Sequence, residues 1–228
     1  MSFPPVSSAL AEPDGLLAMG GDLSPPRLIN AYRNGIFPWF SDGDPLLWWS
    51  PATRALFAPK TLQLNRTLRK QLQKAQLTFT VNQQFARVVA NCAAPRNKQP
   101  ETWILPPIQQ AYLQLHRLQI AHSIEVWQQH KLVGGLYGLA LGGIFCGESM
   151  FNLIPNAAKF ALVALQRHLE HYSAGWIDCQ FPNPFLLQQG ASTMPRAEYL
   201  QLLATLQQDM IPPAHWQPSV IDIHCHYA

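Results

Sequence analysis

The spacing of apolar residues changes along the chain, and each spacing predicts a different element. Residues 122–127 alternate between polar and apolar side chains around Ile124 and Val126, residues 128–131 are typical of a turn, and residues 132–150 continue as one or two strands. A short apolar segment predicts one more buried strand at 175–180. Apolar positions at intervals of three and four residues predict helices over residues 25–34, 66–75, 82–92, 107–119, 156–171 and 195–208. The whole pattern predicts an α+β fold that contains an antiparallel hairpin.

The first quarter of the chain is rich in proline, with nine of the 20 prolines before residue 60. Proline fixes φ and removes a backbone donor, so this part is predicted to be an irregular lobe of turns and short helices. One helix is well marked there, since Ser24 is a candidate N-cap, Pro25 suits a first turn and Gly35 suits an end. We expect an N-terminal lobe over residues 1–60 and a second domain over residues 61–228.

Composition narrows the class of protein. Of the 228 residues, 48% are hydrophobic and 13% are charged, which excludes disorder caused by excess charge. The longest uncharged apolar run, residues 132–146, contains five glycines and is shorter than a membrane span. The first residues lack the features of a secretory signal, and the four cysteines lie far apart, as reduced thiols do. We expect a cytoplasmic protein without a membrane anchor.

Charge is distributed unevenly along the chain. The 56 positions between Asp44 and Glu101 contain no acidic residue, whereas the remainder holds all 13 acidic residues. A basic segment of this length predicts contact with a polyanion, most often nucleic acid, although solvated helix faces give the same pattern. The basic residues of this segment are Arg54, Lys60, Arg66, Arg69, Lys70, Lys74, Arg87, Arg96 and Lys98.

Several common catalytic motifs are absent. No Lys follows a Gly and no two glycines are spaced as GxG, so the sequence has neither a Walker A loop nor a dinucleotide fingerprint. Any transfer reaction must therefore use a donor that is already activated. Residues 147–151 lack the final glycine of a nucleophile elbow. The tail at 222–226 contains Asp, His, Cys and His, but we expect no metal site because nothing after it supplies further ligands.

Two carboxylates lie among apolar residues, Glu148 after the glycine-rich segment and Asp178 inside a short apolar strand. A carboxylate in such a setting must be hydrogen-bonded or have a raised pKa, so both are candidate functional groups, with a capping or turn-stabilising role as the alternative. Gln180 shares a strand face with Asp178 because side chains alternate along a strand.

Tryptophans flank the basic segment at positions 39, 48, 49 and 103. Exposed aromatic rings beside Lys and Arg stack the bases of single-stranded nucleic acid, although tryptophan is more often a core residue.

Seven segments match one known family in the same order. They are residues 19–23 (MGGDL), 34–40 (NGIFPWF), 48–51 (WWSP), 122–127 (HSIEVW), 134–138 (GGLYG), 145–151 (FCGESMF) and 178–180 (DCQ). From about residue 10 to residue 205 the chain resembles the bacterial leucyl/phenylalanyl-tRNA–protein transferases. The ordered series, rather than any one motif, makes the resemblance specific.

The resemblance implies a catalytic domain related to the N-acetyltransferase (GNAT) fold, with an N-terminal domain of its own topology. It implies that Leu or Phe, with Met as a third candidate, moves from the 3′ end of an aminoacyl-tRNA to the α-amine of a protein that begins with Arg or Lys. That transfer marks the acceptor protein for degradation. The ester of the aminoacyl-tRNA is the activated donor, no cofactor is implied, and we expect a monomer.

Positions of the family motifs assign roles to single residues. Trp39 and Trp103 resemble the walls that hold the 3′-terminal adenosine. Leu136, Phe145 and Ile177 resemble parts of the apolar pocket for the Leu or Phe side chain, in which size sets selectivity.

Three polar residues resemble the reacting centre of the family. Asp178 is expected to be the base that orients the amine, Gln180 its hydrogen-bonding organiser, and Glu148 a nearby acid for the cationic acceptor. Six basic residues are expected to contact tRNA phosphates: Arg54, Lys60, Arg66, Arg69, Lys70 and Lys74.

The chain departs from the family pattern at two notable positions, Ala158 in place of Ser and Phe185 in place of a polar residue. Two alternatives remain open. The first is an RNA-binding protein with an inactive acyltransferase domain, against which the presence of Glu148, Asp178 and Gln180 argues. The second is an enzyme of related fold that transfers amino acids to a cell-wall precursor or a small amine.

Overall fold

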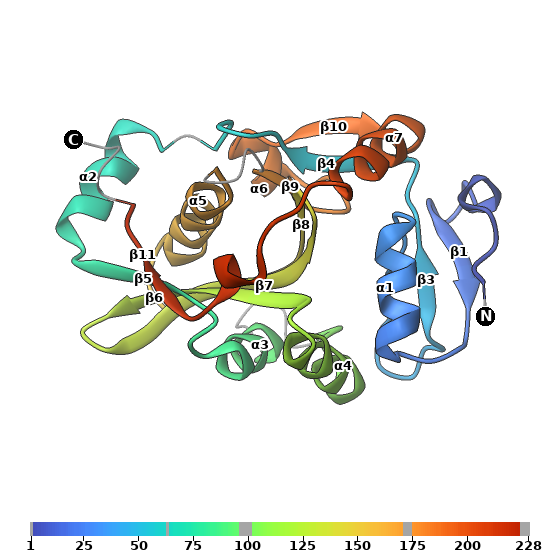
Figure 1. Ribbon diagram of the computed structural model, residues 1–228, viewed down its shortest axis with the longest axis horizontal. Coiled ribbons are helices and arrows are strands. Elements are labelled where there is room, and N and C mark those ends of the chain that lie inside the picture. Colours follow the sequence, from blue (N-terminus) through green and yellow to red (C-terminus); the bar gives the residue numbers. More distant parts are fainter. Residues whose placement is uncertain (1, 63, 96–101, 171–174, 224–228) are drawn as a thin grey trace.

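The computed structural model describes residues 2–62, 64–95, 102–170 and 175–223, and these form a small N-terminal sheet beside a large mixed sheet (Figure 1). Arg96, Lys98 and the tail residues 224–226 lie outside the described residues. Among the described residues, no helix is long and apolar enough to cross a bilayer.

The N-terminal lobe contains a three-stranded antiparallel sheet in the order β1-β3-β2, which the prediction of an irregular lobe missed. Its strands have only two to four residues each: β1 (Leu16–Met19), β2 (Phe37–Pro38) and β3 (Leu47–Trp49). The lobe begins with a 3-10 turn at Val6–Ser8.

The predicted helix of this lobe is confirmed as α1 (Pro25–Arg33), with Ser24 as N-cap residue and Gly35 in the left-handed region at φ 71°. The side chain of Ser24 makes no capping bond. Instead, its backbone N–H donates to Asp22 Oδ1 at 2.9 Å.

Over the described residues the large sheet has eight strands in the order β10-β4-β9-β8-β7-β6-β5-β11, of which only the β8–β9 pair is parallel. The strands are β4 (Thr53–Phe57), β5 (Leu77–Val81), β6 (Ala121–Gln128), β7 (Lys131–Leu141), β8 (Ile144–Asn152), β9 (Trp176–Asp178), β10 (Ser192–Pro195) and β11 (Ser219–Ile221). β4 precedes residue 60 in the chain but belongs to this sheet. The predicted hairpin is confirmed as β6 and β7.

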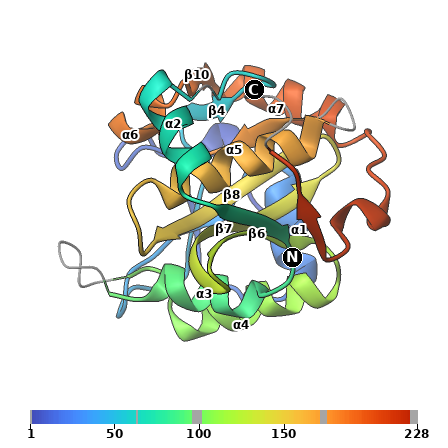
Figure 2. The same ribbon diagram turned by 90° about the vertical axis from the view of Figure 1, so that its left-hand side faces the viewer.

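Helices cover both faces of the large sheet (Figures 1 and 2). One face packs against α2 (Arg66–Lys74) and α5 (Ala157–Glu170), and their buried side chains share one core. The opposite face packs against α3 (Phe85–Ala93) and α4 (Pro106–Arg117), whose core extends to α1 and α7 (Arg196–Leu206). The remaining elements are α6 (Pro184–Gln188) and a 3-10 turn at Pro213–Trp216.

Glycines in β7 let neighbouring elements approach closely. A Cβ added at Gly134 would lie 2.5 Å from the Cβ of Ala157, which begins α5. A Cβ added at Gly138 would overlap the carbonyl oxygen of Cys146 on β8. Close-packed interiors have no room for such an atom. The glycine-rich run is therefore a strand over which α5 and β8 pack tightly.

Candidate active site

The site forms where the parallel strands β8 and β9 separate. Their pairing ends at Cys146 and Asp178, beyond which β8 continues alone on that side. On its other side β8 pairs with β7, and Glu148 is the extra residue of a β-bulge between the pairs that Gly147 and Ser149 make. Bulges commonly redirect a side chain beside an active site. The bulge points Glu148 toward the opening between the strands.

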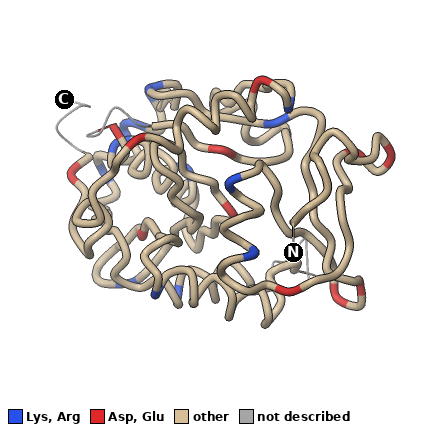
Figure 3. Tube along the Cα trace, turned by 45° about the vertical axis from the view of Figure 1, so that its right-hand side comes forward, with Lys and Arg blue, Asp and Glu red and all other residues tan. Residues whose placement is uncertain are grey.

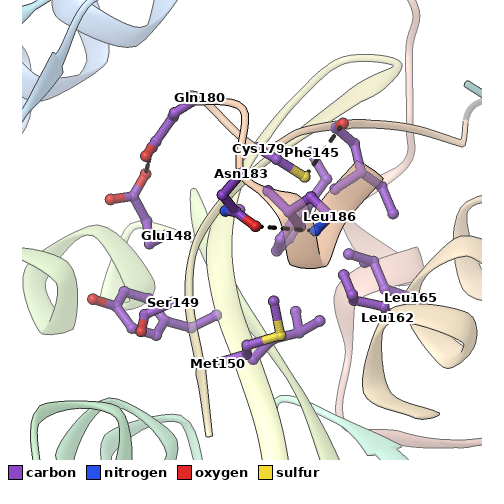
Figure 4. A pocket seen from close by; sticks show the side chains of 14 residues that line it. Phe145, Glu148, Ser149, Met150, Leu162, Leu165, Cys179, Gln180, Asn183 and Leu186 are labelled. Carbon is purple, nitrogen blue, oxygen red and sulfur yellow. Dashed lines mark hydrogen bonds between the residues drawn. The ribbon is translucent and has the colours of Figure 1, made fainter. Parts of the chain in front are cut away.

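A pocket of about 150 Å³ lies at this opening (Figure 4). The three residues predicted to form an aminoacyl pocket, Leu136, Phe145 and Ile177, line it together, and α5 adds Leu162 and Leu165. Figure 4 shows the labelled polar side chains of Glu148 and Gln180 at one end of the cavity. An apolar cavity of roughly this volume in another protein binds benzene, so a Phe ring or a Leu side chain matches it in size.

Glu148 accepts hydrogen bonds from two helices and from the bend after β9. Its Oε1 accepts from the Tyr32 hydroxyl of α1 at 2.6 Å and from Gln180 Nε2 at 2.8 Å, and its Oε2 accepts from the Tyr112 hydroxyl of α4 at 2.7 Å. The two tyrosine hydroxyls also lie within hydrogen-bonding contact of each other, so their two phenolic protons are shared among three contacts when Glu148 is ionised. Burial raises the pKa of Glu148 to about 7, against the lowering effect of these donors.

Tyr32 and Tyr112 are site residues that sequence reasoning missed. Both are almost fully buried on amphipathic helices, and their spacing fits an ordinary core position. Only the packing of α1 against α4 brings the two hydroxyls together, so no local sequence signal marks them.

Gln180 adopts a left-handed backbone conformation, at φ 63°. This conformation is uncommon for a residue other than glycine and occurs where surrounding bonds enforce it, often at functional sites. Here the backbone N–H of Gln180 donates to Asp178 Oδ1 at 2.9 Å. The resulting turn directs the side-chain amide to Glu148.

Asp178 lies behind the pocket rather than in it. Its carboxylate is fully buried and accepts from Arg54 Nε at 2.8 Å, Arg54 Nη2 at 2.7 Å, the Tyr199 hydroxyl at 2.9 Å and the backbone of Gln180. Four donors occupy both oxygens, and Asp178 does not line the cavity. This geometry is at odds with the expected amine-orienting base, because Asp178 contacts Gln180 only through the backbone N–H of that residue.

Arg54 requires a correction, because the prediction that it contacts tRNA phosphates is wrong. Its side chain is 2% exposed, forms the bidentate ion pair with Asp178 and donates to the Gly35 carbonyl at 3.0 Å. Its guanidinium also lies over the rings of Phe37 and Tyr199. The prediction assigned Arg54 to the tRNA surface because of its charge alone. Charge does not distinguish an exposed cation from one that forms a buried ion pair.

The other basic candidates lie on the surface. Asn65 caps α2 by accepting from the Leu68 N–H at 2.9 Å, and Leu68 and Leu72 turn one helix face into the core. The opposite face of α2 exposes Arg66, Arg69, Lys70 and Lys74, and Lys60 is also exposed in the preceding segment. Figure 3 shows that many acidic positions lie instead on the loops of the N-terminal lobe. The tRNA contact of these five residues remains a prediction.

Trp39 is 43% exposed and packs edge-on against Trp49, with ring centroids 5.6 Å apart. It also lies 5.7 Å from the ring of Phe181, the residue after Gln180. Trp39 is therefore close to the site. Trp103 is half-buried three residues before α4. A shared adenosine between Trp39 and Trp103 remains a prediction.

The two departures from the family pattern lie at α5 and α6. Ala158 is buried in the first turn of α5. The Lys159 ammonium lies 5.6 Å from the centre of the Phe185 ring, within the range of a cation–π contact. Phe185 thus has a cationic neighbour beside the residues that line the pocket.

An apolar pocket next to a paired carboxylate and amide is typical of one class of protein, enzymes that hold an apolar substrate group beside polar reacting groups. Comparisons with known proteins identify which enzymes of this class are related. Family models match residues 56–204, as "Leucyl/phenylalanyl-tRNA protein transferase", and residues 21–52, as the N-terminal domain of the same family. The chain belongs to the leucyl/phenylalanyl-tRNA–protein transferase family.

Two curated relatives carry the name leucyl/phenylalanyl-tRNA–protein transferase. The one from Shewanella piezotolerans is 54% identical over 222 residues, and the one from Tolumonas auensis is 52% identical over 221 residues. Each alignment covers 97% of this chain and 94% of the relative. Among solved structures, the C-terminal domain of a putative lysylphosphatidylglycerol synthetase from Agrobacterium fabrum aligns with a TM-score of 0.41 and 16% identity, over 87% of this chain and 63% of that one.

Proposed function

We propose that this protein transfers Leu or Phe, with Met as a third donor, from aminoacyl-tRNA to the α-amine of proteins that begin with Arg or Lys, which marks them for degradation. The observation that supports this function best is the apolar pocket that ends at the Glu148–Gln180 pair. The pocket matches the side chain of the donor, and the polar pair lies where its ester would react.

The reaction needs no external energy source. The side chain of the aminoacyl group occupies the pocket, with its ester carbonyl beside Gln180 and the acceptor amine beside Glu148. The amine nitrogen attacks the carbonyl carbon, a peptide bond forms, and the bond to the ribose oxygen breaks. One amine proton passes to the Glu148 carboxylate, and Glu148 then gives that proton to the ribose oxygen as it leaves, which returns the carboxylate to its ionised form. Holding both reactants in this geometry supplies much of the rate enhancement.

The pKa of Glu148 suits this proton transfer. An α-amino group has a pKa of about 7.7–8.0, and a general base works best when its own pKa lies near the working pH. Burial raises the pKa of Glu148 to about 7. Glu148 therefore becomes ionised, and able to accept a proton, just below the pH range in which the amine loses its charge.

Exposed cations on α2 are proposed to bind the tRNA backbone. We expect the double substitution Lys70→Ala and Lys74→Ala to raise the KM for leucyl-tRNA while kcat changes little, because both residues lie outside the pocket. For every phosphate that the variant no longer neutralises, the negative slope of log affinity against log salt should become shallower by about 0.7–0.9. Arg117→Ala is the matched control, since Arg117 is exposed at the end of α4 on the opposite face of the sheet. An unchanged salt slope in the double variant would exclude α2 from the tRNA surface.

We also propose that the large sheet is related to the GNAT fold and that the protein acts as a cytoplasmic monomer. The parallel β8–β9 pair, whose strands separate at the site, supports the first proposal. One chain can bind both the aminoacyl-tRNA and the acceptor protein, so the proposed reaction does not require a second copy of the chain.

The function is tested by transfer of labelled Leu from leucyl-tRNA to two peptides that differ only in an N-terminal Arg or Ala, without ATP or coenzyme A. We expect label on the Arg peptide alone. Binding of leucyl-tRNA without any labelling would indicate an RNA-binding protein with an inactive site, and equal labelling of both peptides would remove the acceptor rule.

A further inference from the structure

The segment that follows α7, residues 209–223, runs back along the large sheet to its edge, and we name it the C-terminal strap (Figure 1). It contributes one large buried side chain, Trp216, which is 7% exposed. The Trp216 ring lies against the ring of Phe145, with centroids 5.8 Å apart and planes inclined by 29°. Because Phe145 lines the aminoacyl pocket, Trp216 lies directly behind a wall of that pocket.

Trp216 is held in place from several directions. Its carbonyl oxygen accepts from Asn82 Nδ2 at 2.6 Å, and its ring stacks on His122 with centroids 4.1 Å apart and planes inclined by 11°. Burial lowers the pKa of His122 to about 3, so the stacked imidazole is neutral at physiological pH. Beyond Trp216, β11 pairs with β5. The ring therefore has little freedom to move away from Phe145.

A second cavity, of about 310 Å³, has Trp216 in its wall. Trp216, His122 and Ala140 line this cavity, whereas Phe145 lines the aminoacyl pocket. The contact between the two aromatic rings thus joins the wall of one cavity to the wall of the other. A smaller side chain at position 216 would leave space behind Phe145, and surrounding groups relax only partly into such space.

We propose that Trp216 is a specificity-determining residue that acts through Phe145 and sets the depth of the aminoacyl pocket, and with it the preference between Leu and Phe. This inference rests on the proposed function. The full thickness of the Trp216 ring holds Phe145 forward, which keeps the pocket shallow and favours Leu. When the side chain at position 216 is smaller, Phe145 moves back. The Phe side chain of the donor, which is longer than that of Leu, then enters the pocket more easily.

The test compares kcat/KM for phenylalanyl-tRNA with kcat/KM for leucyl-tRNA, measured with the Arg-starting peptide on one preparation of each variant. This ratio does not depend on the fraction of folded enzyme. We expect Trp216→Leu to raise the Phe-to-Leu ratio about tenfold, at the lower end of what one methylene contributes in an apolar pocket. Trp216→Phe, which keeps an aromatic ring, should raise it less and serves as the test if Trp216→Leu does not fold.

The matched control is Ile221→Ala, also a buried residue of the strap but on β11, at the far edge of the sheet from β8. It shortens a buried side chain of the strap but keeps the backbone pairing of β11 with β5 and the ring behind Phe145, so its ratio should equal that of the wild type. An unchanged ratio in both Trp216 variants, or an equal shift in Ile221→Ala, would overturn the inference. In either case transfer by the wild type is still seen, whereas absence of wild-type transfer would instead refute the proposed function.

Discussion

Glu148→Gln is expected to lower single-turnover transfer by at least 100-fold, in the range of about 10²–10⁴ that a positioned general base contributes. The amide keeps the size of the side chain but cannot take up the amine proton. In the wild type, transfer should rise with pH through an apparent pKa of about 7, since only ionised Glu148 accepts a proton. The variant should lose that step and keep only the rise due to the acceptor amine, at about pH 7.7–8.0.

Tyr32→Phe is the companion variant for this prediction. The Tyr32 hydroxyl lowers the pKa of Glu148, so its removal should raise that pKa and move the step to higher pH without abolishing transfer. A wild-type profile with no step near pH 7, or one that Glu148→Gln leaves in place, would exclude Glu148 as the base.

The same raised pKa also links stability to pH. The folded protein holds a proton on Glu148 up to about pH 7, whereas the unfolded chain releases it near the ordinary value of 4.5. This contribution to the free energy of unfolding is therefore present at low pH and is lost as pH rises toward about 7. Glu148→Gln should remove that part of the pH dependence.

Arg54→Met is expected to destabilise the fold by about 3–5 kcal/mol, because it leaves the buried Asp178 carboxylate without its ionic partner. Transfer should fall as well, since Asp178 holds the backbone of Gln180. Urea unfolding and single-turnover transfer measure the two effects separately. If Arg54 instead contacted phosphate, the variant would unfold like the wild type and show a weaker salt dependence of tRNA binding.

The double variant Arg54→Met with Asp178→Asn is the control for the buried pair. Removing both charges leaves no unpaired ion in the interior, so most of the stability should return. Transfer should remain below that of the wild type, because the uncharged side chain at position 178 holds the backbone of Gln180 less firmly. If the double variant is no more stable than Arg54→Met, the ion pair is not the source of the effect.

The sequence predicted the long periodic elements well and the short ones poorly. The helix at Ala157–Glu170 and the strand at Ala121–Gln128 are confirmed, because their apolar residues repeat over many positions. The small sheet of the N-terminal lobe and β4 were missed, since strands of two to five residues show too few repeats, although the apolar segment at β9 did predict a strand of three residues. Pairing with distant partners, rather than local spacing, creates these strands.

A similar limit applies to the site. The resemblance located Leu136, Phe145 and Ile177, which the fold brings into one cavity. It did not reveal that Arg54 and Asp178 are buried together, because residues 124 positions apart meet only when β4 pairs with β9. Side-chain partners across a sheet depend on register, and register is a property of the whole fold.

The most direct test of the proposed site is a structure of the protein with an adenosine whose 3′ position carries leucine through a stable amide instead of the ester. We expect the leucyl side chain between Leu136, Phe145 and Ile177, with its carbonyl beside the Gln180 amide and Glu148 open to an incoming amine. A leucyl group bound outside this pocket, or a carbonyl directed away from Gln180, would contradict the proposed site.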